Sequence, residues 1–433
     1  SSASGKNVTA AFSTFLNQPG VPLVSTSLEC KQGMPVLHLA QQRYLPLGTK
    51  GSTDQHWQIP VCVRAGTGAT GESECTLLTQ PQADWTLKAK SCPAWVEAND
   101  NAVGYYLVDY QSSLLKGLTA GDVQKRMNAA ERVDFMGNAQ SLTQGGKLPA
   151  AYALQLVDTF HADPERYVVL GAIDLALFPL ADMVPNDLMP KYVHFLRENF
   201  QARAHELGWV PKAGETDDVH LLRPRLLRVV ATYARDEQLA KQARELTDQW
   251  FENRTAIDSS MVVATLSTAA YYGDKALFER FMAELDKTKD RQERQRILTA
   301  MDHFRDREAI HAGMEAVLAG KIPYMEGLGL LFSGQTEEAT RQMPFDFMKE
   351  HFDELAAKRP TGGGFDAGAV FPQVGASYCS AERKEQLQSF FQPKVDRFTG
   401  APRALAQVLE TIDICAALKA SESAGVQDFL AKY

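Results

Sequence analysis

The run Gly104–Tyr110, GYYLVDY, separates two kinds of sequence in this chain of 433 residues. Its mixture of aromatic and aliphatic residues is typical of a β-strand, and the preceding NDNAV (99–103) is typical of a turn. Strand-like runs dominate before it. After it, apolar residues recur at spacings of three and four, which is typical of helices. We therefore interpret Tyr110 as the end of a β domain and expect a helical domain to follow.

The β domain is predicted to be a small sandwich over residues 20–110. Short runs rich in Val, Leu, Thr and aromatic residues are bounded by Gly, Pro, Asp or Ser, as in VPLVSTSLEC (21–30) and PVLHLAQQRYL (35–45). About seven such runs in about ninety residues are typical of a β-sandwich. Ahead of it, FLNQPGVPLV (15–24) turns from helix to extended chain at Pro19-Gly20, because proline cannot continue a helix.

The remainder, residues 111–433, is predicted to be an α-helical solenoid. About thirteen or more helical runs follow one another, joined by short connections that carry Gly, Asp or Pro. RYVVLGAIDLALFPLADMV (166–184) is apolar nearly all round, which predicts a buried helix. Stacked helix pairs of this kind suggest an armadillo/HEAT-like architecture, although no strict repeat consensus is visible. The predicted fold class is thus multidomain, β followed by α.

Composition excludes several classes of partner. The net charge is -8, and no basic stripe accompanies it, so we expect no nucleic-acid partner. No apolar stretch approaches about 18 residues, so we expect no membrane span. The start SSASGKNVTA has no apolar core of a signal peptide, and a leader would have to lie ahead of Ser1.

Two cysteines suggest a disulfide. Cys62 and Cys75 lie in strand-like runs on either side of the Gly-rich GTGATGE (66–72), and a hairpin turning there would place them opposite each other. Two free thiols packed as small apolar groups are an equal alternative. A disulfide would indicate an oxidising compartment, so we expect an extracytoplasmic protein, periplasmic or secreted, with a cytoplasmic location as the open alternative.

The chain contains no convincing catalytic centre in its local motifs. The nearest approach to a helical HExxH zinc motif is His205-Glu206, but position 209 is Trp, so the second ligand is missing. The other histidines are scattered. We therefore assign no catalytic residue, no metal ligand and no cofactor to this chain. A surface His-Glu pair near a helix end is the simpler interpretation.

One basic segment is a candidate for peptide binding. LLRPRLLR (221–228) contains Arg223, Arg225 and Arg228, and on a helix Arg225 and Arg228 share a face. A solvated basic edge is the default interpretation. A wall that binds carboxylates and faces a peptide is the sharper alternative.

Several stretches, in order, resemble the second half of zinc aminopeptidases of the aminopeptidase N and endoplasmic-reticulum aminopeptidase type. In the first quarter they are FLNQPGVPLV (15–24), QQRYLP (41–46), WQIPVCVR (57–64) and CPAWVEANDNAVGYYLVDY (92–110). Further along they are DPERYVVLGAI (163–173), LGWVPKAGETDD (207–218), FDFMKEHFDEL (345–355), SYCSAERKEQLQSFF (377–391) and GAPRALAQVLETI (400–412). The resemblance covers essentially the whole chain, and the ordered set carries it rather than any single stretch.

The resemblance implies a role without catalysis in this chain. The family's zinc motif, its downstream Glu ligand, its GxMEN loop and its catalytic tyrosine have no matching positions here. Residues 1–19 would be the last helix of a missing catalytic domain, which would hold the zinc. The rest would be a spacer and a helical bowl that covers the active-site cavity and limits access of peptides. Its partners would be its own N-terminal catalytic domain and peptide substrates.

Two points stay open. GKIPYMEG (320–327) stands where many family members have an Arg-Lys-Gln-Asp-like segment, so a basic site for a peptide end is not carried over. The alternative function is a stand-alone α-solenoid that binds peptides or proteins as a scaffold, and a weaker one is an enzyme with an unrecognised site in the bowl.

Overall fold

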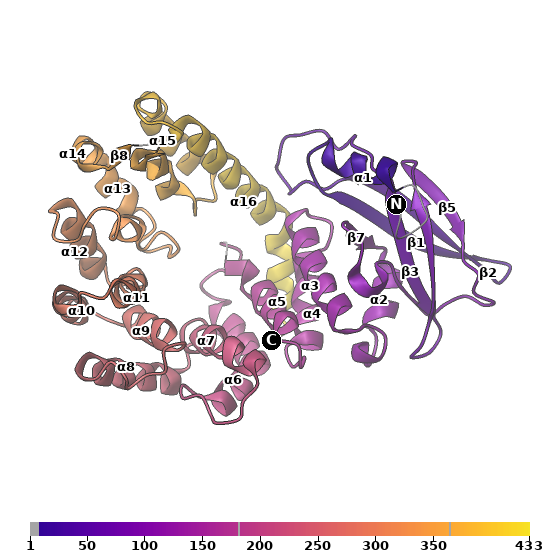
Figure 1. The fold of residues 1–433 in the computed structure, drawn as a ribbon, viewed down its shortest axis with the longest axis horizontal. Helices are drawn as coiled ribbons and strands as arrows, with labels where there is room; N and C mark the ends of the chain where they lie inside the picture. The colour runs from indigo at the N-terminus through magenta and orange to yellow at the C-terminus, as the bar shows by residue number, and fades with distance from the viewer. Residues whose placement is uncertain (1–7, 181, 363–364) are drawn as a thin grey trace. The chain divides into compact units, whose positions relative to one another are not determined.

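The computed structural model describes residues 8–180, 182–362 and 365–433 (Figure 1). The chain divides into two compact units, Ser1–Leu177 (unit 1) and Phe178–Tyr433 (unit 2). Unit 1 contains a β-sandwich and the helices that follow it, and unit 2 is mainly helical. The predicted fold class, a small β-sandwich followed by a helical superhelix, is confirmed.

The sandwich consists of two sheets. β5 (Gln82–Thr86), β2 (Met34–Arg43), β1 (Pro22–Lys31) and β7 (Leu107–Tyr110) form one sheet in this order, and β4 (Glu72–Leu78), β3 (Ile59–Gly66) and β6 (Trp95–Glu97) form the other. Along β2, Leu37 and Leu39 are buried while the alternate residues are partly exposed, as period-two alternation requires. Trp57 and Trp95 are the largest buried side chains of this core.

A short helix precedes the sandwich. α1 (Thr9–Leu16) ends before Pro19-Gly20, and β1 begins at Pro22. Gly20 has φ +111°, a conformation that favours glycine, and an added Cβ would meet the side chain of Arg43. The Pro-Gly corner predicted from the sequence therefore depends on a glycine at this position.

Four helices complete unit 1: α2 (Ser112–Thr119), α3 (Ala129–Gln144), α4 (Ala150–Phe160) and α5 (Arg166–Leu177). α3 begins with a capping box in which Asn128 and Glu131 satisfy each other's backbone N–H groups. It packs against β7, and α5 is buried along most of its surface. Because these helices pack with the sandwich, the compact unit ends at Leu177 and not at Tyr110. The domain limits 20–110 and 111–433 stay a proposal from the sequence.

Unit 2 is an arc of paired helices (Figure 1). α7 packs against α9 and α9 against α11, and these three, which we call the inner layer, lie on the inner side of the arc. The bounds of the first helices are α6 (Met189–Leu207), α7 (Asp217–Thr232), α8 (Glu237–Glu252), α9 (Val262–Tyr271), α10 (Lys275–Lys287), α11 (Arg291–Met301) and α12 (Arg307–Leu318). The later ones are η4 (Leu328–Phe332), α13 (Met343–Glu350), α14 (Phe352–Lys358), η5 (Ala367–Gly375), α15 (Ala381–Phe391) and α16 (Ala401–Leu430).

An aspartate precedes each of three helices that alternate with the inner layer, namely α8, α10 and α12. Asp236, Asp274 and Asp306 cap α8, α10 and α12, each accepting a hydrogen bond from the backbone N–H three residues later. Each aspartate follows the end of an inner-layer helix by a few residues. The structural repeat is therefore encoded mainly in caps and apolar spacing, which explains why the sequence shows no strict consensus.

The last helix returns to the first helix of unit 2. α16 packs against η5 and α15, and its end lies beside α6. There Phe195 contacts Phe429 and Tyr433 with ring centroids 5.5 and 5.3 Å apart. These contacts join the two ends of the arc within unit 2.

Candidate functional site

The structure places Cys62 and Cys75 directly opposite each other on β3 and β4. Their Cα atoms are 4.0 Å apart and their sulfur atoms are joined as a disulfide. It also joins Cys30 to Cys92 and Cys379 to Cys415, two pairs that lie far apart in the sequence and that sequence reasoning missed. The redox state of the pair at 62 and 75 stays a prediction for a chemical measurement.

The three arginines of the basic segment have different surroundings. Arg223 of α7 is completely buried, and its Nη2 donates to a carboxylate oxygen of Glu215. Its Nε and Nη1 have no hydrogen-bond partner in the structure. In this position Arg223 anchors the loop before α7 and has no surface to offer a peptide.

Arg225 and Arg228 are half-buried on α7. Burial lowers the pKa of Arg228, and the positive charge of Arg225 lowers it further, while Tyr233 opposes the shift. His303, which follows α11, is near enough for the Arg228 charge to act on it. Burial lowers the pKa of His303, and the charge of Arg228 lowers it further. The hydrogen bond to Thr299 and the charge of Asp302 act in the opposite direction and raise it. The inner layer therefore brings together basic groups that are 75 positions apart.

A polar cluster, which we call the junction, lies where the sandwich meets α3. Arg64 of β3 donates from Nε to Asp100 over 2.8 Å, from Nη1 to the carbonyl of Arg126 and from Nη2 to Glu131. Glu131 also accepts from the backbone N–H groups of Asn101 and Asn128 over 2.8 Å each. Hydrogen bonds thus satisfy the buried carboxylate of Glu131.

Glu97 of β6 is a buried acid of the junction with one carboxylate oxygen that accepts no hydrogen bond among the described residues. It is buried, and its Oε1 accepts from the backbone N–H of Asn99 (3.0 Å) and the hydroxyl of Tyr110 (3.1 Å). Its Oε2 has no hydrogen-bond partner in the structure. Burial raises the pKa of Glu97 to about 8, and the neighbouring negative charges of Glu131 and Asp134 add to the shift.

The three tyrosines of the run 104–110 differ in burial. Tyr106 and Tyr110 are buried; the Tyr106 hydroxyl donates to the Ala98 carbonyl over 2.8 Å, and the Tyr110 ring packs on Phe135 of α3. Tyr105 is exposed and packs on Phe15 of α1 with centroids 6.3 Å apart. Tyr110 therefore links the sandwich to α3, while Tyr106 is held within the sandwich.

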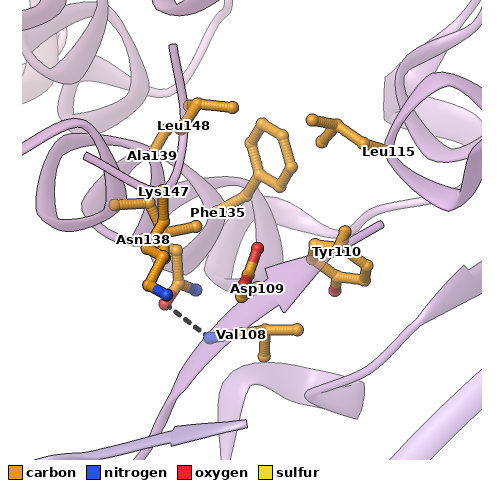
Figure 2. Close-up of a pocket in the computed structure, with 10 residues that line it drawn as sticks. Val108, Asp109, Tyr110, Leu115, Phe135, Asn138, Ala139, Lys147 and Leu148 are labelled. Atoms are coloured by element: carbon orange, nitrogen blue, oxygen red, sulfur yellow. Dashed lines mark hydrogen bonds between the residues drawn. The ribbon is translucent and has the colours of Figure 1, made fainter. Parts of the chain in front are cut away.

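Figure 2 shows a small cavity at the edge of the junction, between β7 and α3. The backbone N–H of Val108 donates to the Asn138 amide oxygen over 3.1 Å at its wall, and Phe135 and Leu148 close it. Its volume of about 30 Å³ is enough for one or two water molecules. It is a packing cavity of the sandwich rather than a substrate site.

The described residues do not form a zinc site. Within residues 8–180, 182–362 and 365–433, no group of three or more His, Cys, Asp or Glu side chains could hold a metal ion. The His205 ring bonds to Asp236, the cap of α8, over 2.7 Å. The histidine of the His-Glu pair therefore contributes to helix packing. Among the described residues, none of the helices has the length and apolar character that a membrane span requires.

Comparison with known proteins gives a consistent answer. The model of the family described as "ERAP1-like C-terminal domain" matches residues 95–414. The chain is 24% identical to the puromycin-sensitive aminopeptidase of Caenorhabditis elegans over 99% of its own length and 46% of that protein. It is 25% identical to aminopeptidase M1 of Arabidopsis thaliana (95% and 47%) and 22% identical to endoplasmic reticulum aminopeptidase 2 of Bos taurus (88% and 40%).

The chain spans about half the length of the curated relatives that it matches. The family match covers most of the chain, from β6 in the sandwich into α16. The chain therefore belongs to the ERAP1-like C-terminal domain family.

Proposed function

We propose that this chain is the non-catalytic C-terminal part of a zinc aminopeptidase, in which the sandwich is a spacer and the helical unit covers the active-site cavity and limits peptide access. The observation that carries the proposal is the asymmetry of coverage. Nearly all of this chain matches relatives named aminopeptidases, but it matches less than half of their length. The catalytic zinc would belong to the part that this chain does not contain, and we derive no step through it.

An exposed apolar surface on unit 1 supports a partner domain. Phe12 and Leu16 of α1 are 63% and 69% exposed, and Val103 and Tyr105, before β7, are 73% and 68% exposed. Contact between Phe15 and Tyr105 joins the two groups into one surface. Contiguous apolar groups on a surface are typical of protein interfaces. We propose that the N-terminal catalytic domain packs here.

The cysteines support a proposal for the compartment. All six cysteines of the chain are paired in the structure. Disulfides persist in oxidising compartments and are rare in the cytosol. We propose that the protein folds outside the reducing cytosol. Mass spectrometry of the purified protein with and without reduction tests this, and six free thiols in the protein isolated from its own source would contradict it.

The function is tested in two steps. The purified chain should hold no stoichiometric zinc and should not hydrolyse aminoacyl-methylcoumarin substrates; chelator-sensitive hydrolysis would overturn the proposal. The catalytic half of the same gene, supplied as a separate chain, should bind this chain, and Phe12→Asp should weaken that binding about tenfold or more. Met34→Asp is the matched control, because Met34 is an exposed apolar residue of the same unit outside this surface.

The gene also separates this proposal from a stand-alone binding scaffold. An in-frame HExxH motif upstream of Ser1, with a glutamate about two dozen residues later, would support the aminopeptidase. A start codon or signal sequence directly before Ser1 would contradict it.

A further inference from the structure

We propose that Glu97 controls the exposed apolar surface of unit 1: the turn 99–104, which carries Val103 and leads into Tyr105, is held ready for the partner domain only while the Glu97 carboxyl group carries a proton. The inference rests on the proposed function, because it names how contact with the catalytic half would be regulated. It concerns residues of unit 1 alone, and the response of the turn can be measured without the catalytic half.

The turn is held by side chains of its own and of α3. The Asn99 side chain closes it, because Oδ1 accepts from the backbone N–H of Gly104 over 2.8 Å and Nδ2 donates to the Gly104 carbonyl over 3.2 Å. Asn101 and Ala102 have φ values of 57° and 54°, which residues other than glycine rarely adopt. The backbone N–H of Asn101 donates to Glu131 over 2.8 Å. The shape of the turn therefore depends on hydrogen bonds that outweigh an unfavourable backbone conformation.

Asn99 also connects the turn to Glu97. Its backbone N–H donates to Oε1 of Glu97 over 3.0 Å, and its Nδ2 donates to Asp134 of α3 over 3.2 Å. Asn99 and Glu97 are 1% and 2% exposed. A change in the charge of the Glu97 carboxyl group therefore acts directly on the residue that closes the turn.

The surroundings of Glu97 suit a neutral carboxyl group better than a charged one. Its Oε2 has no hydrogen-bond partner among the described residues. Burial raises the pKa of Glu97 to about 8, and the charges of Glu131 and Asp134 raise it as well. The titratable and charged groups around Glu97 are Glu131 and Asp134 of α3, Tyr106 and Tyr110 of β7, Asp100 of the turn and Arg64 of β3, which is itself paired with Asp100 and Glu131. Glu97 is therefore mainly protonated at neutral pH.

The turn is the element that ionisation of Glu97 would displace. β6 and β7 are fixed by strand pairing with β3 and β1, whereas the turn lies outside the sheets and the α-helices, and Asn101 and Val103 are exposed. A buried carboxylate oxygen without a partner is unfavourable, so an ionised Glu97 favours entry of water. Opening of the turn admits water without breaking a strand pair. Tyr105, which follows the turn and packs on Phe15 of α1, would move with it.

The test compares the 433-residue chain with Glu97→Gln at pH 6 and pH 9. Glutamine keeps the acceptor for Asn99 and Tyr110 and does not ionise, so the variant should fold with a closed turn. Methyl NMR follows Val103, assigned with Val103→Ala. We expect the Val103 signal of the wild type to shift as pH rises, and that of Glu97→Gln to stay constant. Equal shifts in the two proteins would overturn the proposal.

Asp134→Asn is a second variant that changes the charge beside Glu97. It keeps an oxygen to accept from Asn99 but removes a negative charge. The midpoint of the Val103 shift should move to lower pH, because a neighbouring negative charge raises the pKa of an acid. A role of Asp134 in packing alone would leave this midpoint unchanged, and an unchanged midpoint would overturn the proposal.

The catalytic half, supplied as a separate chain, tests the regulation of docking. The wild type should bind it about tenfold or more weakly at pH 9 than at pH 6, because about nine tenths of a group with a pKa of about 8 is ionised at pH 9. The same ratio measured with Glu97→Gln gives the pH effect of all other groups. Equal ratios for the two proteins would overturn the regulation. Absence of binding to both proteins at pH 6 would instead overturn the proposed docking, while the Val103 signal still decides whether the turn responds to Glu97.

Discussion

The junction, in unit 1, and the inner layer, in unit 2, differ in whether their arginine side chains are paired with carboxylates. In the junction, Arg64 is paired with Asp100 and Glu131, and one backbone N–H group donates to each oxygen of Glu131. In the inner layer, Arg228 is half-buried with no partner among the described residues. The charge of Arg64 is balanced within the chain, whereas the charge of Arg228 has no counter-charge among the described residues.

This contrast separates a charge that helps to maintain the fold from a charge that forms no ion pair among the described residues. A completed network resists change, because removal of one member leaves the others buried and unpaired. An unpaired charge can be removed at little cost to the fold, but binding that depends on it is lost. The difference can be tested by substitution, and the expected effects decrease in the order given below.

Arg64→Met should have the largest effect. Its removal leaves Asp100 and Glu131 buried without their counter-charge, and the loss of one partner of a buried pair typically costs about 3–5 kcal/mol. Chemical denaturation followed by circular dichroism measures this. Arg403→Met, an exposed change of the same kind, should have an effect below about 0.5 kcal/mol. Similar curves for the two variants would show that Asp100 and Glu131 do not depend on the charge of Arg64.

Removal of the Cys62–Cys75 bridge should have the next largest effect. The double variant Cys62→Ser, Cys75→Ser should lose about 2–4 kcal/mol of unfolding free energy, because the bridge restricts the unfolded chain. The same comparison in a strong reductant is the control, and the difference between variant and wild type should largely disappear there. A difference that persists under reduction would mean that the cysteines act by packing alone.

Glu97→Gln should change how stability depends on pH. The folded pKa of Glu97 is raised to about 8, above the ordinary value of 4.5. Below pH 4.5 both states carry the proton and the wild type is fully stable. As pH rises toward 8, only the unfolded state ionises, so stability is lost over this window. Glutamine does not ionise and keeps the acceptor for Asn99 and Tyr110.

The measurement for Glu97 is the difference in unfolding free energy between the variant and the wild type, followed from pH 5 to pH 8. It should grow in favour of the variant by up to about 3 kcal/mol, since one pKa unit corresponds to about 1.4 kcal/mol. Other groups titrate in both proteins and cancel in the difference. A constant difference across this range would contradict the burial of an unsatisfied carboxyl group.

The sequence predicted the sandwich well because its signals are local. The Gly-rich turn between Cys62 and Cys75 and the alternation in β2 depend on neighbours within a few residues. The sequence also contains a signal for the burial of Arg223, since Leu226, Leu227 and Val230 follow it at helical spacings of three, four and seven. Three apolar residues on one face outweigh the preference of one arginine for water.

The rest of the candidate site could not be read from the sequence. The pKa of Glu97 is raised mainly by burial, and then by the charges of Glu131 and Asp134, which lie on a helix more than thirty positions later. The charge of Arg228 acts on His303, 75 positions later, because α7, α9 and α11 pack side by side. That Arg228 has no partner in the described chain depends on all the side chains around it. Such a property appears only when the tertiary structure is known.

Arg228→Gln should have the smallest effect on stability, within about 0.5 kcal/mol of the wild type or slightly above it. The reason is that glutamine removes a desolvated charge and breaks no contact of the folded chain. Arg223→Gln, five positions earlier on α7, is the matched control: it should clearly destabilise, because Arg223 is fully buried and bonded to Glu215. The same denaturation curves compare the two. If Arg228→Gln were as destabilising as Arg223→Gln, Arg228 would contribute to the stability of the fold, and the contrast between the paired Arg64 and the unpaired Arg228 would fail.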